Sequence, residues 1–374
     1  MKVMTILGTR PEIIRLSGII PLLDRHAEHV LVHTGQNYDD RLSRIFFEDL
    51  GVREPDVRMG VRADSFSGQI GQILERSEAL LLEHRPDRLL ILGDTNSGIS
   101  AIVARRLGIP VFHMEAGNRC FDDRVPEEVN RRVIDHSSSV LMPYTNRSRE
   151  NLLREGIRAD RIFVTGNPIK EVIDRYKDKI AASHALSETG VEEGKYFLAT
   201  MHRAENVDVE MRLRGLIEGL GRLHGRYGFP VICSLHPRTR ARVKKYLVEA
   251  GSTELRFMEP LRFFDFIRLE QSAFCLLTDS GTVQEEACLF GVPNVTIRDV
   301  TERPETVECG SNVLTGTDPG TIERMVDLAT SLRGKWQPPP EYLSANVADT
   351  VCRILLGYFT PDPAEMEWRT GLRA

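Results

Sequence analysis

The chain has 374 residues, of which 41% are hydrophobic and 28% charged, and its formal charge at pH 7 is −5. This composition is typical of a soluble globular protein, and the acidic balance argues against a nucleic-acid binder, which usually carries a basic excess. The length suggests two domains, or three, at about 150 residues per domain. No uninterrupted apolar run approaches the roughly 20 residues that a membrane helix needs, so we expect no membrane partner.

The N-terminal segment predicts a β-strand and no secretion signal, because Arg10 and Glu12 interrupt its apolar run early. The six cysteines lie far apart, without a CxxC pair or zinc-ribbon spacing. Dispersed thiols in a chain of this length favour a reducing cytoplasm and give no indication of a metal site.

Short apolar runs alternate with amphipathic stretches, a pattern typical of βα units around parallel sheets. In the first half we expect strands at Val3–Leu7, Val30–His33, Arg88–Leu92, Pro110–His113, Ser139–Met142 and Ile162–Val164. The helices expected there are Pro11–Arg25, Ser65–His84, Ser97–Leu107 and Pro126–Ser137.

A second series of elements follows the turn-rich segment Thr165–Pro168. Its expected strands are Tyr196–Thr200, Pro230–Ser234, Leu255–Met258, Phe274–Thr278 and Pro293–Ile297. Its expected helices are Met211–Tyr227, Thr239–Glu249, Gly281–Phe290 and Pro319–Leu332, before a last helix at about Asn346–Leu356. We therefore predict an α/β fold with two Rossmann-like, doubly wound parallel-sheet domains at residues 1–168 and 169–345. Residues 346–374 would form a C-terminal helix and tail that packs back on the first domain.

Polar residues directly after the apolar runs carry the functional signal, because ligands of open α/β sheets bind at the carboxyl ends of strands. In the first half these residues include Asp94, Glu115 and Glu127. Asp94 could instead cap a helix, and Glu127 could form an ordinary ion pair with Arg131 four residues later. If the three acids converge, at least one pKa should rise, and the set could serve as acid and base. His113 is better interpreted as a core histidine whose hydrogen bonds are satisfied.

In the second half, Ser280, Gly281 and Thr282 open a helix and offer N–H groups and hydroxyls to a diphosphate. Glu286 lies far enough along the helix to reach a ribose hydroxyl. The chain lacks GxGxxG after the first strand, GxxxxGK[ST], HExxH and GxSxG, which argues against a bound dinucleotide, a P-loop, a zincin site and a nucleophile elbow.

Together these segments resemble the non-hydrolysing UDP-N-acetylglucosamine 2-epimerase family. The matching strings, in family order, are GTRPE (8–12), HTGQN (33–37), GDTNS (93–97), HMEAGNR (113–119), PEEVNR (126–131), GNP (166–168), HRAEN (202–206), TDSGTVQEEA (278–287) and RDVTERPE (298–305).

The resemblance implies a glycosyltransferase-B-like fold, a homodimer, a UDP-sugar held between two domains and no cofactor. It implies that UDP is eliminated to give an enzyme-held 2-acetamidoglucal and then re-added, so that UDP-GlcNAc and UDP-ManNAc interconvert. By motif position the catalytic residues would be Asp94, Glu115, Glu127 and His202. The substrate-binding residues would be Arg10, Arg15, Arg131, His236, Arg238, Phe266, Ser280, Gly281, Thr282, Glu286 and Arg303.

Several positions depart from the family pattern. Arg15 stands where a lysine is usual, Thr282 where many members have glycine, and Ala204 where a second arginine is common. The strings GTRPEIIRLS and EAGNRCFDDRVPEE look more like a branch that forms UDP-N-acetyl-L-fucosamine from a UDP-2-acetamido-2,6-dideoxyhexose for surface polysaccharide. That activity, and a glycosyltransferase on the same fold, are the alternatives.

Overall fold

The structure is a computed structural model that describes residues 1–35, 40–63, 65–235, 237–246 and 254–358. The chain forms two compact units. The first comprises Met1–Val172 together with the segment from Ser344 onward, and the second comprises Ile173–Leu343. Each unit contains a six-stranded sheet whose paired strands all run parallel.

The sheet of the first unit has the strand order β3-β2-β1-β4-β5-β6. Its strands are β1 (Lys2–Leu7), β2 (Glu28–His33), β3 (Val57–Arg58), β4 (Arg88–Leu92), β5 (Val111–Met114) and β6 (Val140–Met142). The central strands are continuous apolar runs because helices cover both of their faces, and Met4 of β1 pairs with Val30 on one side and Leu89 on the other.

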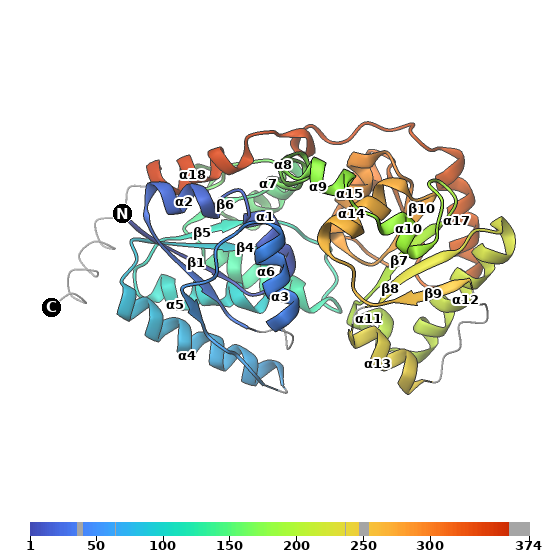
Figure 1. Ribbon diagram of the computed structural model, residues 1–374. Helices are drawn as coiled ribbons and strands as arrows, with labels where there is room; N and C mark the ends of the chain where they lie inside the picture. Colours follow the sequence, from blue (N-terminus) through green and yellow to red (C-terminus); the bar gives the residue numbers. More distant parts are fainter. Residues whose placement is uncertain (36–39, 64, 236, 247–253, 359–374) are drawn as a thin grey trace. The chain divides into compact units, whose positions relative to one another are not determined.

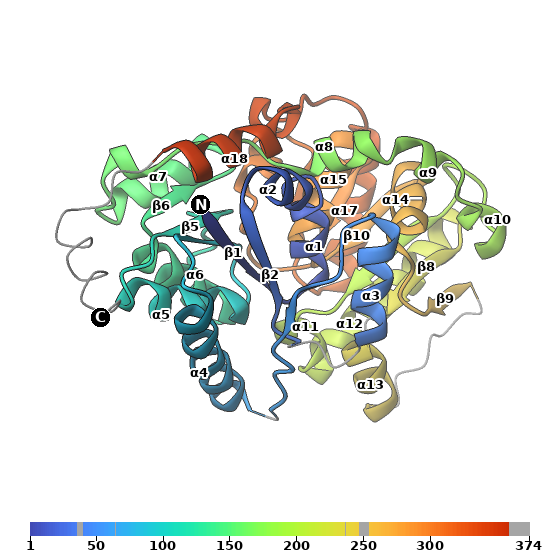
Figure 2. The same ribbon diagram turned by 60° about the vertical axis from the view of Figure 1, so that its left-hand side comes forward.

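Helices cover both faces of this sheet. The helices of this unit are α1 (Arg10–Leu16), α2 (Ile20–His26), α3 (Asp40–Asp49), α4 (Phe66–His84), α5 (Ser100–Arg106), α6 (Pro126–Ser137), α7 (Asn146–Arg154) and α18 (Val347–Gly357), and α8 (Ile169–Arg175) begins in this unit and ends in the second. In Figure 1, α2 and α18 lie along one face of the sheet, and α4 and α5 lie along the other. Figure 2 shows α18 beside α2 from a second side.

The C-terminal helix α18 is fastened to the first unit at both ends. Near its start, the Ala348 N–H donates to Glu171 Oε2 at 3.0 Å. At its end, the Arg88 guanidinium donates to the carbonyls of Leu355 and, at 3.2 Å, Tyr358. Because carbonyls at a helix C-terminus lack partners within the helix, Arg88 satisfies them and ties α18 to β4.

The sheet of the second unit has the strand order β12-β11-β10-β7-β8-β9. Its strands are β7 (Phe197–Met201), β8 (Val231–Leu235), β9 (Leu255–Met258), β10 (Cys275–Thr278), β11 (Asn294–Thr296) and β12 (Asn312–Leu314). Its helices are α9 (Lys177–Ala181), α10 (Ala185–Thr189), α11 (Ala204–Val207), α12 (Glu210–Tyr227), α13 (Pro237–Lys245), α14 (Phe263–Ser272), α15 (Gly281–Phe290), α16 (Pro304–Glu308) and α17 (Pro319–Ser331).

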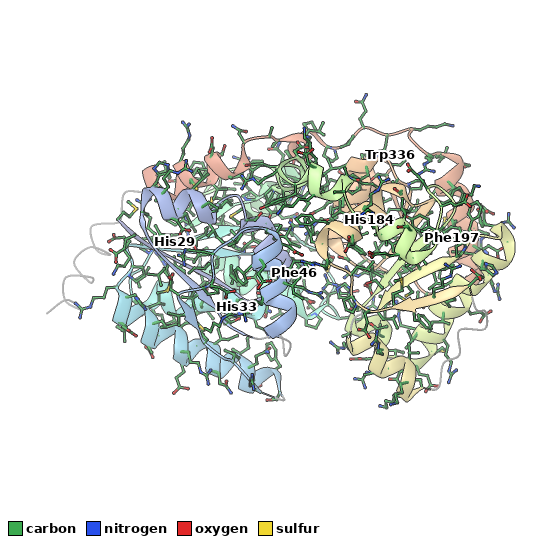
Figure 3. The ribbon with its side chains drawn as sticks, viewed as in Figure 1. His29, His33, Phe46, His184, Phe197 and Trp336 are labelled. Atoms are coloured by element: carbon green, nitrogen blue, oxygen red, sulfur yellow. The ribbon has the colours of Figure 1, made fainter. Side chains whose placement is uncertain are left out.

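Alternate residues of β7 face opposite layers of the second unit. Phe197 and Ala199 pack in one core cluster with residues of α12 and α17, whereas Leu198 packs in another with residues of α14 and α15. Phe197, labelled in Figure 3, lies edge-on to Phe274 with 5.5 Å between ring centroids. The period-2 alternation of a strand therefore divides the core into two layers.

The structure differs from the predicted elements in a few places. The single helix expected over Pro11–Arg25 is two helices, because the chain turns at residues 17–19 and Pro21 lies in the first turn of α2. The strand expected at Ile162–Val164 is only a bridge between Leu141 and Ile162. Three-residue β12, two-residue β3 and eight helices were not predicted; the helices are α3, α7, α8, α9, α10, α11, α14 and α16. Part of the helix expected at Thr239–Glu249 lies outside the described residues.

In each unit, neighbouring parallel strands end at the same edge of the sheet. We call the turns after β1, β4 and β5 (residues 8–10, 93–97 and 115–119) the first rim. We call the turns after β7, β10 and β11 (residues 202–206, 279–281 and 297–303) the second rim. Among the helices of the described ranges, none is both long and apolar enough to cross a bilayer.

Candidate active site

Asp94 follows β4 on the first rim and is paired with a buried guanidinium. The Arg131 side chain of α6 forms an ion pair with Asp94 and also donates to Glu128 Oε2 at 3.3 Å. Asn130 donates to the Asp94 carbonyl at 3.0 Å, which fixes the backbone of the same turn. The Asp94 side chain is 19% exposed and that of Arg131 only 3%, so the carboxylate faces outward from a fixed cation.

Glu115 follows β5 and is the second carboxylate of this rim. It accepts from Arg15 Nη1 at 2.9 Å and from Asn118 Nδ2 at 3.2 Å. The Arg15 guanidinium lies 5.4 Å from the centre of the Tyr144 ring. Glu115 adopts φ +62°, a left-handed conformation that is strained for residues other than glycine. The surrounding contacts therefore hold Glu115 in one orientation.

The two acids at the start of α6 have different environments. Glu127, the residue selected from the sequence, is half-buried. Glu128 is buried and accepts from the N–H groups of Cys120 at 3.1 Å and Phe121 at 3.2 Å. Burial alone would raise the pKa of Glu128, but these N–H groups and the charge of Arg131 lower the pKa below its usual value. Glu128 thus stabilises the loop after Glu115, a role that the sequence did not reveal.

A raised carboxyl pKa directly beside this rim is found at Glu12 in α1, which sequence reasoning did not single out. Burial raises the pKa of Glu12 from 4.5 to about 7, although hydrogen bonds from Thr9 and Gly8 oppose the change. Glu12 Oε2 accepts from the Thr9 N–H at 2.7 Å and the Gly8 N–H at 3.1 Å. The signal in the sequence was the Thr9–Glu12 spacing, which is that of a capping box.

Arg10 extends from the same turn as Glu12. Its guanidinium lies 5.6 Å from the centre of the Phe46 ring, which belongs to α3 and is labelled in Figure 3. A half-buried arginine that stacks on an aromatic ring is a side chain suited to binding an anion.

On the second rim, His202 and Asp279 form a close pair. His202 Nδ1 lies 2.9 Å from Asp279 Oδ1, and the same carboxylate accepts from the N–H groups of His202 and Arg203, each at 3.0 Å. Burial would raise the pKa of Asp279, but the His202 charge and these hydrogen bonds lower the pKa to about 2. The His202 side chain is 38% exposed, so its ring is held from behind and remains accessible.

The turn after β10 opens α15, as the sequence predicted. Ser280 is the N-cap residue, and its own N–H donates to Thr278 Oγ1 at 2.9 Å. A Cβ at Gly281 would lie 3.1 Å from Glu302 Oε1 and 3.4 Å from Arg303 Cζ. Gly281 therefore lets the helix start approach the turn after β11 closely. Thr282 is half-buried in the first turn of this helix.

Three arginines of the second rim are held by buried glutamates. Glu302 accepts from Arg203 Nη2 at 3.0 Å and from Arg298 Nη1 at 2.7 Å. Arg303 forms an ion pair with Glu285. Such cations, fixed beside a helix N-terminus, are suited to binding an anion.

The remaining predicted residues of this unit lie in different settings. Glu286 is buried on α15 and lies against Glu270 of α14; burial and the neighbouring Glu286 raise the pKa of Glu270 well above its usual value. Phe266 of α14 packs at the edge of the core cluster that contains Leu276 and Val283. Arg238 forms an ion pair with Asp208. His236 lies outside the described residues.

The fold and the two rims define a class of protein: two Rossmann-like units, one with oriented carboxylates and one with a helix start whose geometry is suited to an anion. The lipopolysaccharide glycosyltransferase WaaG shares this fold, with a TM-score of 0.60 over 95% of this chain and all of that one. At 13% identity the likeness shows the fold alone. It is the glycosyltransferase-B-like fold expected from the sequence.

The family follows from closer similarities. The model of the family described as UDP-N-acetylglucosamine 2-epimerase matches residues 22–356. The UDP-N-acetylglucosamine 2-epimerase of Methanocaldococcus jannaschii is 39% identical over 363 residues, which is 95% of this chain and 99% of that one. Its crystal structure in complex with UDP-GlcNAc and UDP has a TM-score of 0.90. A UDP-2,3-diacetamido-2,3-dideoxy-D-glucuronate 2-epimerase of Pseudomonas aeruginosa is 37% identical over 341 residues, 90% of this chain and 93% of that one. The chain belongs to the UDP-N-acetylglucosamine 2-epimerase family and is an isomerase.

Proposed function

We propose that this enzyme interconverts UDP-GlcNAc and UDP-ManNAc by inversion at C2 of the hexose, without a cofactor. The observation that carries the proposal is the similarity along nearly the full length to a relative named for this activity and crystallised with UDP-GlcNAc and UDP. The two arginine-paired carboxylates of the first rim, Asp94 and Glu115, support it.

The chemistry requires both acid–base groups and stabilisation of a leaving anion. The C2 hydrogen is not next to a carbonyl group, so a positioned base must remove it while the C1–O bond breaks and UDP takes the bonding electrons. The product of this step is 2-acetamidoglucal. UDP then adds back to C1 while an acid delivers a proton to the opposite face of C2.

We assign the acid–base work to Asp94, Glu115 and Glu127. Arg131 and Arg15 hold the first two carboxylates in fixed orientations. A fixed carboxylate does not have to be reoriented during the reaction, which is the basis of electrostatic preorganisation. Arg10, in the turn after β1 on the first rim, would bind a negatively charged group of the substrate.

We assign UDP binding to the second rim. The start of α15 at Ser280, Gly281 and Thr282 would bind the diphosphate, with Arg303 beside it. His202, oriented by Asp279, would donate from its other ring nitrogen to a phosphate oxygen as UDP leaves. Glu286 would accept from a ribose hydroxyl, and Phe266 would lie near the uracil.

The sugar specificity has a second candidate, a UDP-2-acetamido-2,6-dideoxyhexose, which would give UDP-N-acetyl-L-fucosamine. Relatives of this chain differ in the sugar for which they are named, and one is named for a substrate altered at C3 and C6. Parallel turnover assays with UDP-GlcNAc and a UDP-2-acetamido-2,6-dideoxyhexose decide between the two. We further propose that the enzyme is a cytoplasmic homodimer that supplies sugars for cell-surface polysaccharide. Light scattering tests the oligomeric state, and cell fractionation tests the location.

The defining experiment is incubation with UDP-GlcNAc in deuterated water. We expect UDP-ManNAc to form and deuterium to appear at C2 of both sugars, because the proton removed from C2 exchanges with solvent. Product without this label would contradict the elimination mechanism. If UDP-GlcNAc is not converted while the dideoxy sugar is, the specificity belongs to the second candidate.

Variants of the two carboxylates test the residue assignment. Glu115→Gln and Asp94→Asn should each lower kcat by about 10²-fold or more, because a general acid or base contributes about 10²–10⁴-fold. Asp160→Asn is the matched control, since Asp160 is exposed on the same unit and its carboxylate forms a local ion pair with Arg158. Unchanged turnover in both site variants would refute the assignment.

A further inference from the structure

A buried histidine lies directly beneath the first rim. His113 belongs to β5 and is 1% exposed. Its Nδ1 lies 2.9 Å from Asp135 Oδ1 of α6, and its Nε2 lies 2.9 Å from the carbonyl oxygen of Gly93. The sequence indicated a core histidine with satisfied hydrogen bonds, and these contacts agree with that interpretation.

The two partners of His113 determine the protonation of its ring. A backbone carbonyl can only accept a hydrogen bond, and so can an ionised carboxylate. Hydrogen bonds from both ring nitrogens to these two acceptors require the imidazolium form of the ring. Burial would raise the pKa of Asp135, but the hydrogen bonds and charges of His113 and Arg119 lower the pKa below its usual value.

Asp135 carries the connection onward to the turn after β5. Its second oxygen accepts from the Gly117 N–H at 3.2 Å and from Arg119 Nη2 at 2.7 Å. Arg119 in turn forms a two-bond pair with Glu155, at 2.8 and 2.7 Å. With His113 protonated, the charges alternate in sign from His113 to Glu155, and the network is neutral as a whole.

The atoms that this network holds belong to the two turns that carry Asp94 and Glu115. Gly93, directly before Asp94, has φ +72°. Glu115 and Gly117 have φ +62° and +79°. Left-handed turns of this kind persist only where surrounding contacts fix them. His113 and Asp135 provide such contacts, because they connect the carbonyl of the Gly93 turn to the N–H of the Gly117 turn.

We propose that His113 is a positioning residue: its imidazolium, held by Asp135, fixes the Gly93 and Gly117 turns relative to each other and thereby aims Asp94 and Glu115 at the substrate. The inference rests on the proposed function of these two carboxylates. A displacement of about 1 Å of a catalytic group can cost about 10²-fold in rate. Loss of the bond to Gly93 should therefore lower kcat without weakening UDP binding, which we assign to the other unit.

Two variants separate the two hydrogen bonds of the ring. His113→Asn keeps an N–H near the position of Nδ1 and so keeps the bond to Asp135, but it loses the bond to Gly93. His113→Gln keeps an N–H near the position of Nε2 and so can still bond to Gly93. His136→Gln is the control, because His136 is 52% exposed on α6 and contacts only Glu155 of the network, at 3.4 Å.

We expect His113→Asn to lower kcat by about 10²-fold with an unchanged dissociation constant for UDP, and His113→Gln to lower it by less than about tenfold. His136→Gln should match the wild type. A kcat for His113→Asn within twofold of the wild type would overturn the proposal. Equal losses in His113→Asn and His113→Gln that follow their melting temperatures would also overturn it, in favour of a purely structural histidine.

Nitrogen-15 NMR of the histidine rings provides a measurement that does not depend on turnover. In the wild type, both ring nitrogens of His113 should show the chemical shifts of a protonated ring. These signals are assigned to His113 because they are absent from the spectrum of either His113 variant. If either variant fails to fold, the other assigns the signal, and a neutral His113 ring refutes the inference. No conversion of any UDP-sugar by the wild type would contradict the proposed function instead, while the ring signal would still report on the network.

Discussion

Replacement of Asp279 by asparagine tests the second rim most directly. The Asp279 carboxylate is fully buried and accepts from two backbone N–H groups, from Asn206 Nδ2 at 3.3 Å and from the His202 ring. In the Asp279→Asn variant, the amide side chain would present an NH₂ group to some of these donors. We therefore expect the variant to lose stability and to release His202 from its present orientation.

The pKa of Asp279 gives the magnitude of this effect. Its pKa falls from a usual 3.8 to about 2, and one pKa unit corresponds to about 1.4 kcal/mol. The charge of Asp279 therefore contributes about 2–3 kcal/mol to the free energy of unfolding. Because the folded pKa is the lower one, this contribution is present above about pH 4 and disappears as the pH falls through 2. At neutral pH the variant should melt about 5–10 °C lower than the wild type.

The assay is urea unfolding of the wild type and of Asp279→Asn. It is carried out at pH 7 and at the lowest pH at which both proteins fold. The difference in free energy should be about 2–3 kcal/mol at pH 7 and should shrink as the pH approaches 2. Glu192→Gln serves as the control, because Glu192 is exposed and forms an ion pair with the nearby, exposed Lys195. Equal stability at pH 7, or a difference that does not change with pH, would refute the reasoning.

Three further expectations concern the first unit and are measured by urea unfolding. Gly117→Ala should lower the free energy of unfolding by about 3 kcal/mol or more, because Gly117 has φ +79° and a Cβ there would lie 2.3 Å from a backbone oxygen. The control Gly156→Ala, at φ +84° with open space around it, should lower it by only about 1–2 kcal/mol. Equal losses in the two variants would contradict the steric argument. As the pH rises from 4.5 to 7, the free energy of unfolding of the wild type should fall by about 3 kcal/mol relative to that of Glu12→Gln, because the raised pKa of Glu12 makes its ionisation unfavourable in the folded state. The same pH dependence in both proteins would contradict this expectation. Arg15→Met should lower the free energy of unfolding by about 3–5 kcal/mol, because it removes the guanidinium that pairs with the buried Glu115 carboxylate. An unchanged free energy of unfolding would show that stability does not depend on this ion pair.

The sequence predicted the central strands well because both of their faces are buried. Residues 89–91 have no exposed surface, so nothing in that run interrupts the apolar pattern. The edge strands β3 and β12 have two and three residues, too few for a periodic signal. The break between α1 and α2 was missed because Ser17, Gly18 and Pro21 are weak signals within an otherwise amphipathic stretch.

The sequence also located the polar turns after the strands, but it did not identify their partners. Arg15 pairs with Glu115 across 100 positions of the chain, and His202 pairs with Asp279 across 77. At the start of α6, helical spacing allowed a pair between Glu127 and Arg131, but it gave no sign of the bonds from Arg131 to Asp94 and Glu128 that the structure shows. Contacts between turns depend on which strands are neighbours, and local spacing carries no information about that.

By itself, the sequence determined where the strands lie, which polar turns follow them and to which family the chain belongs, because burial and turn formation leave local patterns. Only the tertiary structure decided the proton affinities of the buried acids: Glu12 has a pKa near 7 and Asp279 a pKa near 2. The physical reason is that the proton affinity of a buried group is set by its dehydration and by the charges and hydrogen bonds around it. Those neighbours come from distant parts of the chain and meet only when the sheets assemble.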